Sequence, residues 1–234
     1  MLPGERRRNP APLAGEDVKL DLFADEPALE RRDEPLAPGA VLLRGFARDR
    51  GPALLEALEA VTARAVFRFL ITPGGYRMSV AMTNCGSVGW ISDRTGYRYG
   101  PIDPLTGQQW PAMPVVFAGV AAEAAQAAGF SAFAPDACLI NQYEPGSRLS
   151  LHQDKDEQDY GAPIVSVSLG LPAVFLFGGG LRSDKTQRVP LAHGDVVVWG
   201  GPARLRYHGV LPLKDGEHPL LGRRRINLTF RKAL

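Results

Sequence analysis

The second half of the chain is a succession of short runs of strand-forming residues, and this pattern limits the fold more than any other feature. From Cys138 onward, stretches of β-branched and aromatic residues are bounded by Gly or Pro, the residues that most often end strands and form turns. The clearest runs cover residues 164–169, 174–177, 195–199 and 225–231. Several short strands at close spacing predict an antiparallel sandwich or jelly roll.

Two helices and an aromatic-rich segment precede these strands. Apolar residues at helical spacing predict one helix over residues 51–69, and an Ala-rich run that follows prolines predicts a second over residues 115–128. Between them, residues 72–114 combine many Gly and Pro with scattered Trp, Tyr and Met, which favours short strands and loops. Aromatic side chains in such a segment either fill a core or present stacking surfaces to a planar ligand, and the pattern alone leaves both open.

The chain is 234 residues long, which suits one domain with a substantial core. Residues 1–38 are rich in Pro, Arg, Asp and Glu, and they predict a loosely packed arm with a short anchored piece at residues 20–23. The Arg-rich start at residues 6–8 is expected to be solvated rather than to bind a partner. We therefore expect a single domain over residues 39–234.

Charge, hydropathy and cysteine content exclude several classes of protein. A formal charge of +2 is too small for a protein that coats long stretches of duplex, so any contact with nucleic acid must be local. The most apolar window, residues 115–130, is interrupted by Glu123 and Gln126, which argues against a membrane span. The basic N-terminal residues lack an apolar stretch after them, which argues against a signal peptide. The two cysteines, Cys85 and Cys138, form no disulfide framework or CxxC motif, so reduced thiols in the cytoplasm are expected.

The sequence His152-Gln153-Asp154 is a candidate metal site. In an extended segment, residues two apart point to the same face, so an imidazole and a carboxylate can converge on one ion. With a second, distant histidine they would form the two-histidine-one-carboxylate triad of non-haem iron(II) oxygenases. The motif is weak when taken alone, because the same residues fit a surface histidine beside an acidic run that ends at Asp159.

The last strand carries a second candidate site. Alternation along residues 225–231 places apolar side chains on one face and polar side chains on the other, namely Arg225, Asn227, Thr229 and Arg231. A buried arginine requires an anion, so two guanidinium groups inside a sheet favour a small dicarboxylate ligand. A solvent-facing sheet surface explains the same pattern equally well.

Several motifs occur together, in order, over roughly residues 35–232. The longest are Asn141-Gln142-Tyr143 continuing to Leu151-His152-Gln153-Asp154-Lys155-Asp156, then Leu205-Arg206-Tyr207-His208-Gly209, and Arg225-Ile226-Asn227-Leu228-Thr229-Phe230-Arg231. Shorter ones are Thr72-Pro73-Gly74-Gly75-Tyr76, Thr83-Asn84-Cys85-Gly86 and His193-Gly194-Asp195-Val196-Val197-Val198-Trp199. With these motifs the chain resembles the AlkB family of iron(II)- and 2-oxoglutarate-dependent dioxygenases. Only the N-terminal arm departs from the resemblance, because it is longer and more charged.

The resemblance implies a mixed α/β, mainly β fold. Its core would be a double-stranded β-helix (jelly roll) over about residues 138–232, with flanking helices and a nucleotide-recognition lid over about residues 72–114. It also implies iron(II) as the metal, 2-oxoglutarate as the cosubstrate and O2 as the oxidant.

The resemblance also implies which residues form the site. The implied metal ligands are His152, Asp154 and His208, which leaves His193 and His218 with structural or loop roles. The implied residues for 2-oxoglutarate are Asn141, Tyr143, Arg225, Asn227 and Arg231, and the two arginines suit the two carboxylates of that molecule.

The lid and its surroundings are expected to hold the damaged base. The resemblance places four residues there, namely Trp90, Tyr97, Asp156 and Arg182. We expect Trp90 and His208 to sandwich a flipped base, whose flat face can stack on either ring. Met82 is expected either to line this pocket or to fill space in the core, and a core role is the alternative for Trp90.

The implied reaction is oxidative demethylation of 1-methyladenine and 3-methylcytosine in single-stranded DNA, with RNA as an alternative substrate. Decarboxylation of 2-oxoglutarate to succinate accompanies hydroxylation of the N-methyl group, and the product releases formaldehyde and the repaired base. We expect a monomer that needs no membrane. Two rivals remain open at this point: an enzyme with the same cofactors that acts on a protein side chain or a modified RNA, and a non-catalytic jelly-roll binding module.

Overall fold

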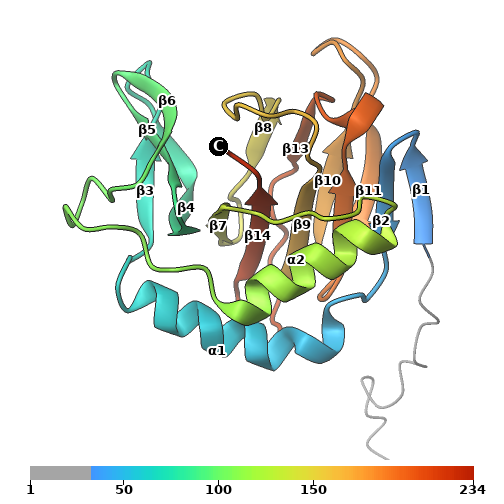
Figure 1. Cartoon of the computed structure of the whole chain (residues 1–234). Coiled ribbons are helices and arrows are strands. Elements are labelled where there is room, and N and C mark those ends of the chain that lie inside the picture. The colour runs from blue at the N-terminus through green and yellow to red at the C-terminus, as the bar shows by residue number, and fades with distance from the viewer. Residues whose placement is uncertain (1–32) are drawn as a thin grey trace, which may run out of the picture.

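The computed structural model describes residues 33–234. It contains two larger antiparallel sheets, a separate two-stranded hairpin, and two helices along the largest sheet (Figure 1). The large sheet has the strand order β1 (Asp33–Ala37), β2 (Ala40–Leu43), β12 (Val196–Trp199), β9 (Ile164–Gly170), β14 (Arg225–Arg231), β7 (Ala137–Tyr143), β4 (Arg77–Gly86) and β3 (Arg68–Ile71). The small sheet has the order β11 (Gln187–Leu191), β10 (Ala173–Phe177), β13 (His208–Val210) and β8 (Leu149–His152). The predicted mainly-β, jelly-roll architecture is confirmed.

The central strands of the large sheet are buried on both faces. Three of them, β12, β9 and β7, contribute side chains to two separate cores, whereas the second face of β14 is polar and lines a cavity. In β12, Val196 and Val198 belong to the core under the helices, whereas Val197 and Trp199 pack with Phe175 of the small sheet. Successive side chains of a strand point to opposite faces, so a continuous apolar run is what such a strand requires. The second core therefore joins the two sheets to each other.

The helices α1 (Gly51–Thr62) and α2 (Val115–Ala127) cover the outer face of the large sheet (Figure 1). The expected second helix is confirmed to within one residue at its end. The expected first helix is wrong beyond Thr62, because residues 68–71 form β3. Residues 66–71 are mostly β-branched or aromatic, and pairing with β4 at the sheet edge satisfies their backbone groups.

The predicted N-terminal arm lies mostly outside the described residues, as does its expected anchored piece at residues 20–23. Residues 33–37, which the sequence assigned to the arm, instead form β1 and pair with β2 at the edge of the large sheet. Leu36 and Ala37 also pack against the core between the sheets, which explains why this stretch is ordered into a strand. The short 3-10 turns η1 (Arg48–Arg50) and η2 (Gly201–Ala203) complete the described elements.

The segment predicted as a lid divides into two parts. The second half of β4 is buried in the large sheet, where Cys85 pairs in register with Cys138, and both thiols are free. The strands β5 (Gly89–Asp93) and β6 (Gly96–Gly100) form a separate hairpin that stands beside β3 and β4 (Figure 1). Within residues 33–234, no helix has the length and apolar character needed to cross a membrane.

His193 and His218 form a stacked pair that joins two loops, with ring centroids 4.6 Å apart. His193 Nδ1 accepts a hydrogen bond from the backbone N–H of Gly170 at 3.0 Å, and His218 Nδ1 accepts one from Leu220 at 3.2 Å. A ring nitrogen can accept a hydrogen bond only when it carries no proton, so Nδ1 is unprotonated in both rings. The pair therefore has the structural role that the sequence suggested for it.

This pair should make the fold sensitive to acid. Burial lowers the pKa of His193 to about 4, with the charges of His218 and Arg48 acting in the same direction against Asp195. An unfolded histidine titrates near its ordinary value of 6.5. Between these two values the unfolded chain binds more protons than the native one, so stability is lost as the pH falls from 6.5 to about 4.

We predict that His193→Asn, which keeps an acceptor near the position of Nδ1 but cannot titrate, flattens this loss. The measurement is the urea midpoint of unfolding at several pH values in this window for both proteins. Other groups titrate in the same range, so only the difference between the two curves is informative. Parallel curves would show that His193 does not contribute.

Candidate metal and cosubstrate site

A cavity of about 810 Å³ lies between the two sheets and the β5-β6 hairpin. Its lining includes all the residues that the sequence singled out for the site: Trp90, Tyr97, Asn141, Tyr143, His152, Asp154, Asp156, Arg182, His208, Arg225, Asn227 and Arg231. Neither His193 nor His218 is among the described residues that line this cavity. The fold thus gathers these residues from seven separate stretches of chain into one space.

Two of the candidate ligands face each other across neighbouring strands. His152 ends β8 and pairs in register with His208, the first residue of β13, and their ring centroids are 4.4 Å apart. Gly209 allows this close approach, because a Cβ at that position would lie 2.7 Å from the carbonyl oxygen of Leu149 on β8. The register of the small sheet is therefore what brings the second histidine to the first.

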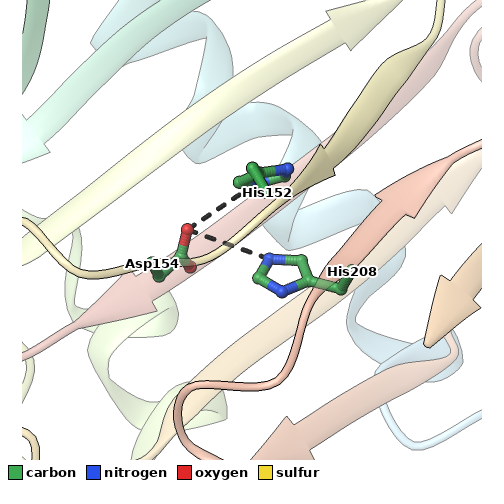
Figure 2. Close-up of side chains that lie close together, drawn as sticks. All are labelled: His152, Asp154 and His208. Carbon is green, nitrogen blue, oxygen red and sulfur yellow. Dashed lines mark ion pairs between the residues drawn. The ribbon is translucent and has the colours of Figure 1, made fainter. Parts of the chain in front are cut away.

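Asp154 lies just beyond the end of β8 and completes the cluster (Figure 2). Its Oδ1 is 3.6 Å from His152 Nε2 and 3.8 Å from His208 Nε2, and one ligand atom from each residue lies within 4.8 Å of the others. Two imidazoles and one carboxylate at this spacing form the facial donor set of non-haem iron(II) enzymes, which leaves one side of the metal open. These three side chains could hold the metal.

Backbone contacts fix the orientation of both imidazoles. Nδ1 of His152 lies 2.9 Å from the Ser150 carbonyl oxygen, and Nδ1 of His208 lies 3.0 Å from the Arg206 carbonyl oxygen. Since a carbonyl can only accept, Nδ1 carries the proton in each ring and Nε2 keeps its lone pair for a metal. Burial lowers the pKa of His208 to about 4, with His152 acting in the same direction, so this ring is neutral at pH 7, as a ligand must be.

Asp154 is a buried carboxylate kept ionised by its neighbours. Burial raises its pKa, but the charge and hydrogen bonds of Arg231 act in the opposite direction, and the pKa of Asp154 lies below its usual range. Arg231 Nε and Nη2 both donate to Asp154 Oδ2, at 2.9 and 2.7 Å. Oδ1 is left facing the imidazoles, so the ion pair orients the carboxylate for metal binding.

The polar face of β14 is buried, which rules out the solvent-facing alternative. Arg225 is 2% exposed and Arg231 is 5% exposed, while Ile226, Leu228 and Phe230 on the other face belong to the core under the helices. Two arginine side chains inside a protein require anionic partners. Arg231 has Asp154 as its partner, whereas Arg225 has no carboxylate among the ion pairs of the described residues.

Arg225 shows that the site fits a carboxylate ligand. Its Nη2 donates to Ser168 Oγ at 2.9 Å, and its guanidinium carbon lies 4.8 Å from the centre of the Tyr143 ring. Its Nε and Nη1 are buried and have no hydrogen-bond partner in the described part of the chain. A buried guanidinium with unpaired donors is suited to hydrogen-bond a carboxylate.

Asn141 and Asn227 lie beside Arg225 on paired strands, since they are in register on β7 and β14. The buried Asn141 Oδ1 also has no partner in the described part of the chain, so a second polar group is available to a ligand. Asn227 Nδ2 donates to Ser166 Oγ at 2.8 Å, which makes it part of the wall rather than a free donor. The unpaired donors of Arg225 suit one carboxylate of a small dicarboxylate such as 2-oxoglutarate.

Three of the four residues expected at the base, Trp90, Tyr97 and Asp156, are in contact with one another, and the fourth, Arg182, lines the same cavity. Trp90 and Tyr97 stack with centroids 5.3 Å apart, and Trp90 Nε1 donates to Asp156 Oδ2 at 2.8 Å. Asp156 and Arg182 are exposed, and Tyr97 is also exposed. Trp90 is half-buried and packs at the margin of the core between the sheets, so part of the core role considered for it is present, and its role at the base stays a prediction.

One expectation about the base needs correction. The side chain of His152 is 38% exposed, whereas that of His208 is only 6% exposed. The edge of Trp199 and the ring of Phe175 pack around His208, with centroids 5.0 and 5.9 Å away. The imidazole that an incoming base can reach is therefore His152, not His208.

A buried network behind the metal ligands was missed by the sequence reasoning. Glu157 is 6% exposed, accepts from Tyr99 Oη at 2.8 Å and from Arg204 Nη2 at 3.0 Å, and lies 3.3 Å from Arg231. Glu157 belongs to an acidic run that looks solvated, and no periodicity separates it from its neighbours. Ser166 and Ser168 were also missed, although their alternation within an apolar strand is a signal that could have found them.

We predict that His208→Ala abolishes metal binding and His193→Ala does not. Loss of a ligand should weaken binding by at least as much as loss of a supporting contact, about 100-fold. Manganese(II) is a suitable probe in calorimetric titrations, because it accepts the same donors without O2 chemistry. The assignment fails if the His193 variant loses metal binding and the His208 variant keeps it.

We predict that Arg225→Ala raises the 2-oxoglutarate concentration needed for half-maximal activity about tenfold or more, because a charge-assisted hydrogen bond contributes about 1.5–3 kcal/mol. Arg225→Lys should restore only part of the affinity, since an ammonium lacks the planar fork. Arg188→Ala, an exposed position on β11 outside the cavity, is the matched control. Unchanged 2-oxoglutarate dependence in both Arg225 variants would contradict the assignment.

Comparison with known proteins agrees with this site. The profile of the 2OG-Fe(II) oxygenase superfamily matches residues 39–231. The alpha-ketoglutarate-dependent dioxygenase AlkB of Salmonella typhimurium is 61% identical over 214 residues, 92% of this chain and 98% of that protein. Its Escherichia coli counterpart is 59% identical over the same shares of both chains.

The fold has a close match among solved structures as well. The structure of OsALKBH1 superposes with a TM-score of 0.75 at 32% sequence identity, covering 86% of this chain and 100% of that one. The family profile spans the helices, all strands except β1, and the β5-β6 hairpin, and the cavity holds two imidazoles and a carboxylate that could bind a metal. The chain belongs to the 2OG-Fe(II) oxygenase superfamily and, within it, to the AlkB family of 2-oxoglutarate-dependent dioxygenases.

Proposed function

We propose that this dioxygenase removes methyl groups from 1-methyladenine and 3-methylcytosine in single-stranded DNA, releasing formaldehyde and restoring the base. The observation that carries the proposal is the arrangement of the cavity. The cluster of His152, Asp154 and His208 lies in the same space as the unpaired donors of Arg225 and the stacked rings of the lid. Metal, cosubstrate and a flat substrate can therefore meet at one place.

Iron(II), when bound, supplies the oxidising chemistry: O2 and 2-oxoglutarate are consumed, one oxygen atom enters the N-methyl group, and the other leaves in succinate, with carbon dioxide as coproduct. The N-hydroxymethyl group then separates as formaldehyde, and the base recovers its original atoms. The remaining work falls to the protein, which binds and orients the reactants.

The buried arginines divide that work. Arg225 offers two donors to a carboxylate of 2-oxoglutarate, and Ser168 and Tyr143 hold the guanidinium in place. Arg231 instead orients Asp154 of the candidate metal cluster through two hydrogen bonds. Arg231 therefore contributes to the metal site directly, in addition to the cosubstrate role that the resemblance implies.

The lid supplies the contacts for a base. Trp90 presents a ring that is already stacked on Tyr97, and His152 is the imidazole exposed toward the cavity mouth. A base that leaves its stack can be held between flat surfaces of this kind, and stacking contributes about 1–3 kcal/mol per base. Asp156 Oδ1 is available to accept from the exocyclic amino group, because Trp90 contacts only Oδ2.

The small net charge favours a local contact with nucleic acid. A single strand suits such a contact, because a base can leave the stack there without breaking a base pair. Two more distant relatives are named for action on nucleic acid, a nucleic acid dioxygenase from mouse and a tRNA demethylase from fission yeast. We propose that the protein acts in the cytoplasm as a monomer. The two free, buried cysteines, Cys85 and Cys138, are consistent with a reducing compartment.

An enzyme with the same cofactors but a protein side chain or modified RNA as substrate would share the metal and cosubstrate residues. The stacked Trp90 and Tyr97 beside a carboxylate favour a planar, cationic substrate over an aliphatic side chain. The decisive experiment offers 3-methylcytosine in single-stranded DNA, the same base in RNA, and a methylated lysine peptide, and measures formaldehyde with iron(II) and 2-oxoglutarate present. Formaldehyde from the peptide alone would overturn the proposal.

We predict that Asp156→Asn selectively impairs repair of cationic lesions. Methylation at N3 of cytosine leaves a positive charge on the base, which a carboxylate attracts and a neutral amide does not. The substitution keeps an acceptor for Trp90, so the lid geometry should be retained. The measurement compares kcat/KM on 3-methylcytosine and on uncharged 1-methylguanine. Equal losses on both, or no loss on either, would show that charge selection does not reside in Asp156.

A further inference from the structure

The β5-β6 hairpin needs a firm attachment, because it carries the rings that face the substrate. It forms its own two-stranded sheet and is not part of either larger sheet. An isolated two-stranded hairpin is only marginally stable in water. Its position relative to the metal site therefore depends on side-chain contacts with the large sheet.

One such contact comes from Asn84 on β4, a residue of the Thr83-Asn84-Cys85-Gly86 motif. Asn84 Nδ2 donates to the Trp90 carbonyl oxygen at 3.1 Å, and the Trp90 backbone N–H donates to Asn84 Oδ1 at 3.0 Å. The amide thus pairs with both backbone groups of a single residue, as a neighbouring strand would. Asn84 is only 2% exposed, so these bonds are protected from water.

The packing around this contact leaves little freedom. A Cβ at Gly89, the residue before Trp90, would lie 2.8 Å from Asn84 Cβ and 2.5 Å from the Trp110 ring. The Trp90 side chain is fixed at two further points, its stack on Tyr97 and its hydrogen bond to Asp156. The backbone of Trp90 is held by the large sheet while its ring is held by the lid and the loop after β8.

We propose that Asn84 is the positioning residue that sets where the Trp90 ring stands above the metal site, and that it thereby determines how tightly a flipped base is held. This inference rests on the proposed function, because it assumes that Trp90 stacks on the substrate. Asn84 itself is not among the residues that line the cavity. Its effect passes through the backbone of Trp90.

Asn84→Asp is the sharpest substitution. The aspartate keeps the shape and the acceptor for the Trp90 N–H, but it places an oxygen against the Trp90 carbonyl oxygen where a donor is required. Thr83→Val is the matched control. Thr83 is the preceding residue on the same strand, is 1% exposed, and donates to the Ala65 carbonyl oxygen without contacting Trp90.

The first measurement is fluorine NMR of the full chain labelled with 5-fluorotryptophan. The chain has three tryptophans, and the signal of Trp90 is assigned by its loss in Trp90→Phe. In Asn84→Asp the Trp90 signal should shift or broaden, while that of Trp199, which is buried between the sheets, reports an intact fold. In Thr83→Val the Trp90 signal should keep its position. An unchanged Trp90 signal in Asn84→Asp would overturn the proposal.

The second measurement separates binding from chemistry. For an oligonucleotide with one 3-methylcytosine, Asn84→Asp should raise KM about tenfold and change kcat less than about twofold, because a misplaced ring loses stacking in both ground and transition states. Binding to the iron- and 2-oxoglutarate-loaded protein without O2 should weaken by the same factor. If Thr83→Val weakened binding of the oligonucleotide as much as Asn84→Asp does, the effect would not be specific to Asn84, and the proposed positioning role would be contradicted.

Trp90→Ala distinguishes failure of this inference from failure of the proposed function. If Trp90→Ala leaves binding of the methylated oligonucleotide unchanged, Trp90 does not hold the base, and the proposed role of the lid is wrong. If Trp90→Ala weakens binding about tenfold and Asn84→Asp does not, the lid role stands and the positioning role of Asn84 is wrong.

Discussion

The structure depends on burying two arginines of one strand beside a carboxylate. Arg225 and Arg231 on β14 lie in the interior, and burial of a cation is unfavourable unless an anion or several acceptors face it. Arg231 is neutralised by Asp154, which in turn faces the two imidazoles. Arg225 has only Ser168 and the Tyr143 ring among its described contacts, so a ligand carboxylate is the natural complement. The candidate metal cluster and the candidate cosubstrate pocket thus meet along the polar face of β14.

The two sheets have different tasks around this line. The large sheet, supported by the helices, holds β14 between β9 and β7, which supply Ser166 and Asn141 to the same cavity. The small sheet brings His152 and His208 together through the register of β8 and β13. The lid is joined to both, by the Asn84 amide to the large sheet and by Asp156 and Glu157 to the loop after β8. Changes in the lid are therefore expected to reach the substrate before they reach the metal.

Much of this could be predicted where local pattern and tertiary structure agree. The alternation of residues 225–231 gave the bounds of β14 and the residues on its two faces, because both faces are packed. The helix expected over residues 51–69 was too long, since pairing of β3 with β4 is a tertiary contact that outweighs helical spacing. His208 could not be matched to His152 by spacing, because β13 is only three residues long and its pairing is non-local. Glu157 was missed because burial of one acid within an acidic run leaves no trace in composition.

The central claim is that the histidine-carboxylate cluster and Arg225 form one site for metal and 2-oxoglutarate, and its most direct test is a binding measurement. Calorimetric titration of 2-oxoglutarate and of glutarate, which lacks the 2-oxo group, is carried out with and without manganese(II). If the two subsites share one cavity, metal should tighten binding of 2-oxoglutarate at least about tenfold and that of glutarate much less, because glutarate lacks the 2-oxo oxygen that would bind the metal beside the carboxylate. Equal affinity of 2-oxoglutarate with and without metal would contradict the account.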